Sequence, residues 1–257
     1  MKNYHKILKF IILLSFTACK KNTESYQGTS SLIIANAVIG SSPLITNFSP
    51  ISGKADSGPF GLYSSAYPIS YGSFGEFSSY SGNTSLTLVQ AVDTNSFLWR
   101  GSFTFQIGGI YSFFLFGDTS KIDTLLVKDS PIVFSTEDSS FGVRFANLCS
   151  ASQPIEVDIS GQMPGSEVSS LVYKGITGFK TYSANADAPA SYTFEFRYVS
   201  TGQLVGPNAS YTFNDILAGI GANTDNNNYR YRNFTLALIG DTSNSGNGVS
   251  VVLINNY

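Results

Sequence analysis

Few residue types in this chain could carry out catalysis, and their arrangement excludes most mechanisms. The 257 residues include a single histidine, His5, which lies in an N-terminal segment that we expect to be removed. Without an imidazole, Ser-His-Asp and Cys-His nucleophiles have no general base, and the usual zinc, copper and haem sites lack ligands. The sequence also contains no Gly-x-Ser-x-Gly elbow and no phosphate-binding loop. We therefore predict no catalytic residue, no metal site and no cofactor.

Carboxylates are the remaining groups that could do chemistry. Glu76, Glu156, Asp158 and Glu195 lie within strand-like runs, and alternation places Glu156 and Asp158 on one face. A glycosidase needs only two such acids at a suitable separation, which a sequence does not show. Because acids in strands usually point into solvent, we expect a polar, exposed face here. A catalytic pair is the less favoured interpretation.

Two Gly-Asp-Thr-Ser sequences, at residues 117–120 and 240–243, offer oxygen ligands of the kind that calcium binds. Neither follows the Asp-x-Asp-x-Asp-Gly pattern of a calcium loop. Glycine permits a positive φ, and aspartate accepts hydrogen bonds from nearby backbone amides. Both sequences are therefore predicted to be structural turns, with calcium binding as the alternative.

An aromatic segment rich in serine and glycine is a better candidate for binding than for catalysis. Rings between small polar residues give rigid, amphipathic contact area for a sugar or a protein partner. We expect Tyr71, Phe74 and Phe77 to fill a core. Tyr63 and Tyr67 are candidate ligand contacts, with plain packing as an equal alternative.

The elements that must position these residues are β-strands. Apolar and polar side chains alternate over residues 103–107 and 192–198, which is the period of a strand with one buried face. Clusters of glycine, serine and asparagine separate the runs at short spacing, and no comparable helical stripe is present. This pattern predicts an all-β protein built as a sandwich and not from βαβ units.

Three landmarks occur twice in the same order, which indicates an internal repeat. They are a strand ending in Ala-Asn, a Tyr and a Phe around a glycine, and a strand followed by Gly-Asp-Thr-Ser. They occupy residues 32–36 and 143–147, 71–77 and 173–179, and 113–120 and 235–243. Each copy is long enough for one core, so we predict two tandem Ig-like antiparallel β-sandwich domains.

The spacing of the landmarks differs between the copies, so each copy carries an insertion. The first insertion holds Tyr63 and Tyr67, and the second holds Asp215 and Asn226. Insertions between shared strands map to loops, where binding function is concentrated. These four residues are therefore the candidate ligand-binding residues.

The N-terminus has the features of a signal peptide, with three lysines ahead of a short apolar run over residues 10–16. The run is too short to span a membrane, which takes about 20 residues. Residues 16–19, Phe-Thr-Ala-Cys, resemble a bacterial lipobox, which implies an acylated Cys19 as the mature N-terminus. An ordinary secretory signal with a chance cysteine is the alternative.

Cleavage after residue 18 changes the charge and leaves one other thiol. Loss of three of the 15 basic residues against 17 acidic ones takes the formal net charge from −2 to −5. No basic patch remains for phosphate contacts, so no nucleic-acid partner is expected. Cys149 adjoins an apolar run and is predicted to be a buried small hydrophobe and not a nucleophile.

These features together resemble a known bacterial family. The order of the Ala-Asn strand, the Tyr-Gly segment, Gly-Gly-x-Tyr at residues 108–111 and strand-Gly-Asp-Thr-Ser is similar to domain-of-unknown-function family 4397 of bacterial lipoproteins. The strand at residues 155–159 resembles the Val-Asp-Val strand of that family. The resemblance implies two tandem domains and carries no assigned activity.

The predicted organisation and function follow from these observations. The segments are a signal peptide (1–18), a lipidated tether (19–30), a first sandwich (31–130), a linker (131–140) and a second sandwich (141–257). We predict a lipoprotein attached to the outer membrane through its lipid, on the cell-surface or the periplasmic side. It would act as a non-catalytic binding or adhesion module for a glycan or a protein. The alternatives are a periplasmic assembly component and, less favoured, a carbohydrate-active hydrolase.

Overall fold

A computed structural model of the chain describes residues 28–48, 68–135, 137–220, 227–243 and 248–256. The first half contains β1 (Thr29–Ile39), β2 (Leu44–Asn47), β3 (Ser73–Tyr80), β4 (Gly82–Gln90), β5 (Asp93–Phe105), β6 (Ile110–Asp118) and β7 (Lys121–Lys128). The second half contains β8 (Ser140–Asn147), β9 (Ile155–Ile159), β10 (Val168–Leu171), β11 (Lys180–Ser183), β12 (Tyr192–Tyr198), β13 (Ser210–Phe213), β14 (Asn233–Ile239) and β15 (Ser250–Asn256). Within the described ranges, no helix is long and apolar enough to cross a membrane.

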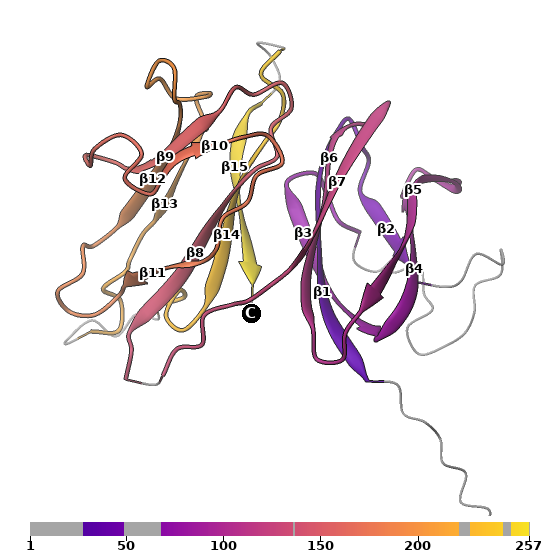
Figure 1. Cartoon of the computed structure of the whole chain (residues 1–257), viewed down its shortest axis with the longest axis horizontal. Coiled ribbons are helices and arrows are strands. Elements are labelled where there is room, and N and C mark those ends of the chain that lie inside the picture. Colours follow the sequence, from indigo (N-terminus) through magenta and orange to yellow (C-terminus); the bar gives the residue numbers. More distant parts are fainter. Residues whose placement is uncertain (1–27, 49–67, 136, 221–226, 244–247, 257) are drawn as a thin grey trace, which may run out of the picture.

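The two halves share one topology, which confirms the predicted pair of β-sandwiches (Figure 1). The inner sheets have the orders β3-β1-β6-β7 and β11-β8-β14-β15, and the outer sheets have the orders β2-β4-β5 and β10-β9-β12-β13. Strands match one for one, except that β10 is added in the second half. Each inner sheet contains one parallel pair, β1 with β6 and β8 with β14, which the repeat alone did not predict.

Three apolar clusters hold these layers together. One fills the first sandwich and another fills the second. A third cluster lies between the two inner sheets, where Ile33 and Phe114 of the first half meet Ala237 and Ile254 of the second. Because successive strand residues point to opposite faces, the inner strands are apolar on both faces. Their continuous apolar runs serve two cores at once.

A buried polar cluster lies at the same interface. Arg144 Nη1 is 2.7 Å from Asp129 Oδ1, and the two side chains are 3% and 0% exposed. Arg144 also donates to the hydroxyls of Ser112 (3.0 Å) and Thr235 (2.8 Å), and Ser112 donates to Asp129 (2.6 Å). Asn256 completes the cluster by donating to Ser112 (3.1 Å). Since Arg144 and Asp129 pair with each other, the cluster joins the two sandwiches without an unpaired ion.

The repeated landmarks have the same structural role in both halves. Asn36 accepts a hydrogen bond from the amide of residue 38 and donates to the carbonyl of Ile69. Asn147 accepts from the amide of Cys149 and donates to the carbonyl of Leu171. Each asparagine is buried and ties its strand to a segment later in the chain. Asn147 is the last residue of β8, whereas Asn36 lies three residues before the end of β1. The Ala-Asn pair therefore makes the same connection in both halves.

The Gly-Asp-Thr-Ser sequences form the predicted structural turns. Gly117 and Gly240 have φ values of 89° and 111°, which favour glycine. Asp118 accepts a hydrogen bond from the Ser120 amide at 2.7 Å, and Asp241 accepts one from the Ser243 amide at 2.6 Å. Hydrogen bonds from these serines lower the pKa of both aspartates. The predicted turn geometry is confirmed in both copies.

Predictions for individual core residues are confirmed only in part. Phe77 packs against the first core, but Phe74 packs against the cluster between the sandwiches, and Tyr71 is 39% exposed. The expectation that all three fill the first core was wrong, because β3 borders the second sandwich as well as its own. Cys149 is buried in the second core, and burial raises the pKa of its thiol to about 12. Its predicted role as a small hydrophobe is confirmed.

Candidate functional site

Of the predicted ligand-binding and lipidation residues, Asp215 lies within the described part of the chain and lines neither of the two cavities described below. Cys19, Tyr63, Tyr67 and Asn226 lie outside the described residues. Asp215 is exposed, with a φ of 57°, in the turn after β13. Because Phe213 pairs with Tyr192, Asp215 lies at the start of β12, whereas two cavities lie near the end of that strand. The roles of these residues stay predictions.

The first cavity, which we call the loop-end pocket, lies at one end of the second sandwich. It has a volume of about 430 Å³ and is lined by Ala151, Gln153, Tyr198, Ser200, Thr201, Gln203, Thr242 and Ser243. These residues come from three connections, those after β8, β12 and β14. Loops gathered at the end of a sandwich are a common place for binding residues.

Hydrogen bonds hold the walls of the loop-end pocket in place. The carbonyl of Tyr198 accepts from the Gly202 amide (2.8 Å), and the Tyr198 amide donates to the carbonyl of Gln203 (2.8 Å), so residues 198–203 form a closed turn. Ser200 Oγ donates to Gln153 Oε1 at 3.1 Å, which joins this turn to the segment after β8. The Tyr198 ring packs partly against the second core. The pocket is therefore formed by the fold and does not depend on a ligand for its shape.

The lining of the loop-end pocket is neutral, amide-rich and hydroxyl-rich, with one aromatic ring. Amide groups both donate and accept hydrogen bonds, and hydroxyls can do the same. A ring beside such groups offers an apolar surface at the edge of a polar site. This chemistry suits a neutral ligand with several hydroxyls.

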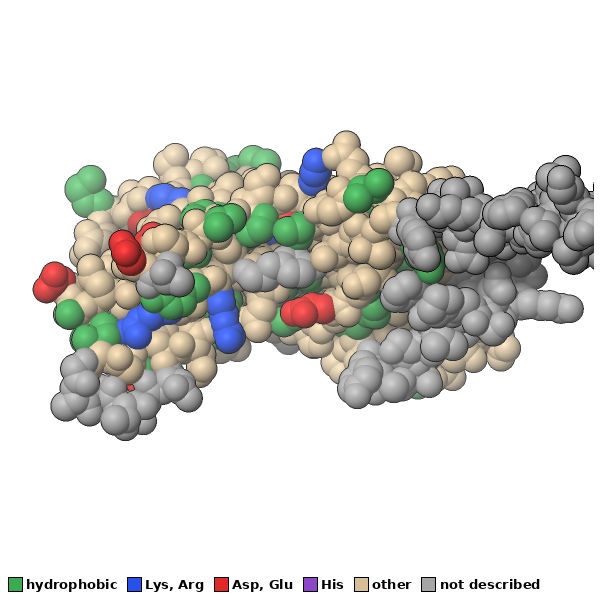
Figure 2. All heavy atoms as spheres, turned by 90° about the horizontal axis from the view of Figure 1, so that it is seen from below, with side chains coloured by type: hydrophobic (Ala, Val, Ile, Leu, Met, Phe, Trp, Pro, Cys, Tyr) green, Lys and Arg blue, Asp and Glu red, His purple; other side chains and the backbone are tan. Residues whose placement is uncertain are grey.

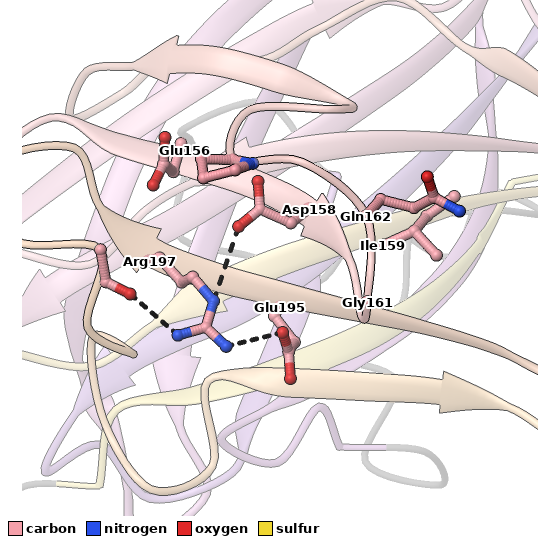
Figure 3. Close-up of a pocket in the computed structure, with 9 residues that line it drawn as sticks. Glu156, Asp158, Ile159, Gly161, Gln162, Glu195 and Arg197 are labelled. Carbon is pink, nitrogen blue, oxygen red and sulfur yellow. Dashed lines mark hydrogen bonds and ion pairs between the residues drawn. The ribbon is translucent and has the colours of Figure 1, made fainter.

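The second cavity, which we call the carboxylate pocket, lies on the outer face of the β10-β9-β12-β13 sheet (Figure 3). It has a volume of about 290 Å³, and its charged lining residues are Glu156, Asp158, Glu195 and Arg197. In the register of β9 with β12, Arg197 pairs with Glu156, and Glu195 pairs with Asp158. Asp158 and Glu195 contact the guanidinium of Arg197, whereas the carboxylate of Glu156 does not.

Each side-chain nitrogen of Arg197 contacts an acceptor in or beside the carboxylate pocket. Its Nη2 donates to Glu195 Oε2 at 2.7 Å, and its Nε lies 3.5 Å from Asp158 Oδ2. Its Nη1 donates to the carbonyl of Gly202 at 2.8 Å. Gly202 belongs to the 198–203 turn, so this turn forms a wall of both pockets.

The acids of β9 share one face as predicted, but the expectation that they lie in solvent was wrong. Asp158 is 4% exposed and Glu156 is 8% exposed. The segment after β9 folds back over them: the Gly165 amide donates to Asp158, and the Glu167 amide donates to the carbonyl of Val157 at 3.0 Å. Alternation predicted the face but could not show what covers it.

Sequence reasoning also missed Arg197 and Tyr198 as site residues. The available signal was a charged pair with a spacing of two on each of two neighbouring strands, Glu156 with Asp158 and Glu195 with Arg197. Outward-facing pairs on adjacent strands form one cluster if the strands pair in register. The sequence does not show that register. Among the described residues, no group of three histidine, cysteine or acidic side chains is placed to hold a metal ion.

On the face of the molecule drawn in Figure 2, charged side chains are few and scattered, and neutral side chains and backbone make up most of the described surface. A continuous basic patch is not present among the described residues of that face. This face offers no extended charged surface for a ligand, so the two pockets of the second sandwich are the better candidates for binding a polar ligand.

Comparison with known proteins identifies no family. No protein-family model and no curated protein matches the chain. Among solved structures, a streptococcal virulence factor described as binding α-glucan is 10% identical, with a TM-score of 0.25, and the match covers 86% of this chain and 97% of that one. A family 26 carbohydrate-binding module from Eubacterium rectale in complex with maltoheptaose is 11% identical, with a TM-score of 0.23 and coverages of 89% and 97%. At these TM-scores, neither structure determines what this chain binds.

Proposed function

We propose that this protein is a non-catalytic glycan-binding module of the bacterial cell envelope, anchored through a lipid on Cys19. The observation that carries the proposal is the neutral lining of the loop-end pocket, to which Tyr198, Gln153 and Gln203 all contribute. A sugar presents hydroxyls to such amides and an apolar face to such a ring. No reacting group is required, which agrees with the lack of a histidine beyond His5.

The tertiary structure supports a preformed site. The 198–203 turn is closed by backbone hydrogen bonds and is tied to Gln153 through Ser200. A site that is ordered before binding loses less conformational entropy when the ligand arrives. The pocket can therefore bind a short stretch of a glycan without rearrangement.

Placement at the cell envelope rests on the sequence. The basic and apolar segments before Cys19 resemble those of bacterial lipoproteins, and the post-cleavage charge of −5 disfavours a nucleic-acid partner. Replacement of Cys19 by alanine should abolish labelling of the protein with a radioactive fatty acid. Protease treatment of intact cells then separates a surface position, in which the protein is digested, from a periplasmic one, in which it is protected until lysis.

The glycan proposal is tested by binding measurements on the full mature chain. We expect a glycan array to yield a neutral oligosaccharide whose affinity falls about fivefold on Gln153→Ala or Gln203→Ala, since each change removes a hydrogen bond worth about 1 kcal/mol. Gln106→Ala, which alters an exposed amide of the first sandwich, is the matched control. Absence of any glycan ligand, together with a stoichiometric protein partner recovered from envelopes, would favour the assembly role instead.

A further inference from the structure

The carboxylate pocket contains one acidic side chain that the protein does not neutralise. Glu156 is buried to more than nine-tenths and lines the cavity. No described residue provides its carboxylate with a hydrogen bond or an ion pair, and no dashed line reaches it in Figure 3. Its oxygens are not among the fully buried side-chain atoms that lack a partner, so the carboxylate faces the solvent of the cavity. The pocket therefore presents one carboxylate that no cationic side chain of the described residues pairs with.

Arg197 does not pair with Glu156 in the observed arrangement. All three of its side-chain nitrogens already have acceptors, namely Asp158, Glu195 and the carbonyl of Gly202. These contacts hold the guanidinium at the side of Asp158 and Glu195. A cation that pairs with Glu156 is therefore not supplied by Arg197, and the carboxylate is free to pair with a ligand that enters the cavity.

We propose that the carboxylate pocket binds a small ligand through a protonated primary amine, which pairs with Glu156. An ammonium group is a compact charge with three donors, whereas a guanidinium is a broad planar fork. The cavity of about 290 Å³ is also lined by Gly161, Gln162 and Pro164, which carry no charge. A divalent metal fits less well, because two of the three carboxylates are already paired with Arg197.

This proposal is independent of the glycan proposal, although the two pockets share the 198–203 turn. The loop-end pocket offers neutral groups and would not distinguish an amine from a hydroxyl by charge. The carboxylate pocket would make that distinction. Variants on opposite sides of the turn can therefore separate the two sites.

Matched small molecules test the amine. Calorimetry on the full mature chain would compare glucosamine with glucose and N-acetylglucosamine, which lack a protonated amine, and with ethanolamine, which lacks the sugar ring. We expect glucosamine to bind at least tenfold more tightly than either neutral sugar. Binding of ethanolamine as well would indicate that the amine alone suffices, and its failure to bind would indicate an amino sugar. Equal affinity for glucosamine and glucose would overturn the proposal.

Two variants tie the binding to Glu156. Glu156→Gln keeps the shape of the side chain and should remove the preference for glucosamine, whereas Glu76→Gln, on an exposed acid of β3, should leave it unchanged. Gln203→Ala should also leave the preference unchanged, because Gln203 lines the other pocket. Loss of the preference in Gln203→Ala but not in Glu156→Gln would overturn the assignment.

The empty protein offers a second test that needs no ligand. If no protein cation pairs with Glu156, Glu156→Gln should leave the melting temperature unchanged or raise it slightly, because the change removes a negative charge near Asp158 and Glu195. Glu76→Gln should not change it. A lower melting temperature for Glu156→Gln would show that the carboxylate has a structural partner and would overturn the proposal.

Discussion

Two arginine clusters in this protein use the same chemical groups with different results. Arg144 and Asp129, between the two sandwiches, are 3% and 0% exposed, and neighbouring hydroxyls and an amide complete their hydrogen bonds. Arg197 is 29% exposed and leaves Glu156 without a partner. A cluster whose donors and acceptors are all satisfied stabilises a structure, while one with an excess acceptor and access to solvent can bind a ligand.

The difference arises from what surrounds each cluster. The Arg144 cluster is enclosed by two inner sheets that also bury Phe114, Ala237 and Ile254, so no ligand can approach it. The Arg197 cluster lies on an outer sheet and is covered only by the segment after β9. Position in the layers therefore decides whether the same ion pair is structural or accessible.

The largest expected effect is at the enclosed cluster. Arg144→Met leaves Asp129 buried without its cation and should lower the free energy of unfolding by about 3–5 kcal/mol. Urea denaturation measures the change. A loss below about 1 kcal/mol would show that the interface does not depend on the ion pair and would remove the contrast between the clusters.

An exposed pair across the same interface provides the control for Arg144→Met. Lys174 Nζ lies 2.8 Å from Asp123 Oδ1, and its side chain is 45% exposed. Lys174→Met should cost about 1 kcal/mol or less, because surface pairs are screened by water and salt. Similar losses in both variants would mean that burial does not set the strength of the pair.

An intermediate effect is expected at the carboxylate pocket. Arg197→Met removes the cation shared by Asp158 and Glu195 and should lower the free energy of unfolding by about 1–3 kcal/mol. Because the site is partly open to solvent, added salt should restore part of the loss by screening the carboxylates. Denaturation of Arg197→Met and Arg144→Met at low and high salt tests this, and an equal salt response in both would contradict it.

The smallest effect is expected at acid pH. A hydrogen bond from Lys174 is the largest cause that lowers the pKa of Asp123 in the folded protein. A lowered pKa means that Asp123 stabilises the fold above its unfolded pKa, and that this contribution is lost as the pH falls through the folded pKa. Asp123→Asn should therefore flatten the acid side of the stability curve by about 1 kcal/mol or less. Melting temperatures measured from about pH 6 to about pH 2 test this, and an unchanged slope would contradict it.

Much of the fold could be predicted because its signals are local. Alternation of side chains identified β12, and the repeated landmarks identified two copies whose strands occupy equivalent places in their sheets. Gly-Asp-Thr-Ser predicted two turns, since a glycine with positive φ and a capping aspartate act within a few residues. The parallel pairs and the third apolar cluster were not predicted, because they depend on which strands become neighbours.

Less of the candidate site could be predicted. Glu156 and Asp158 were placed on one face correctly, but their burial depends on the return of residues 160–167 over that face. Tyr198 and Gln153 meet at the loop-end pocket although they are far apart in the sequence. Asp215 was predicted as a ligand-binding residue because it lies in an insertion. In the structure it lies near the start of β12, whereas the two pockets lie near the end of that strand.

The strands, the repeat, the turns and the burial of Cys149 could all be predicted from the sequence. The reason is that alternation, turn chemistry and hydrophobicity act on neighbouring residues. Each sheet has one face that points away from the core of its own sandwich. Which of these faces form the interface and which form a pocket depends on the packing of the whole chain. The register of β9 with β12 placed Arg197 beside Asp158 and Glu195, and the packing of the inner sheets enclosed Arg144. Whether a charge is paired depends on groups brought together from distant parts of the chain, and so it is a property of the folded protein.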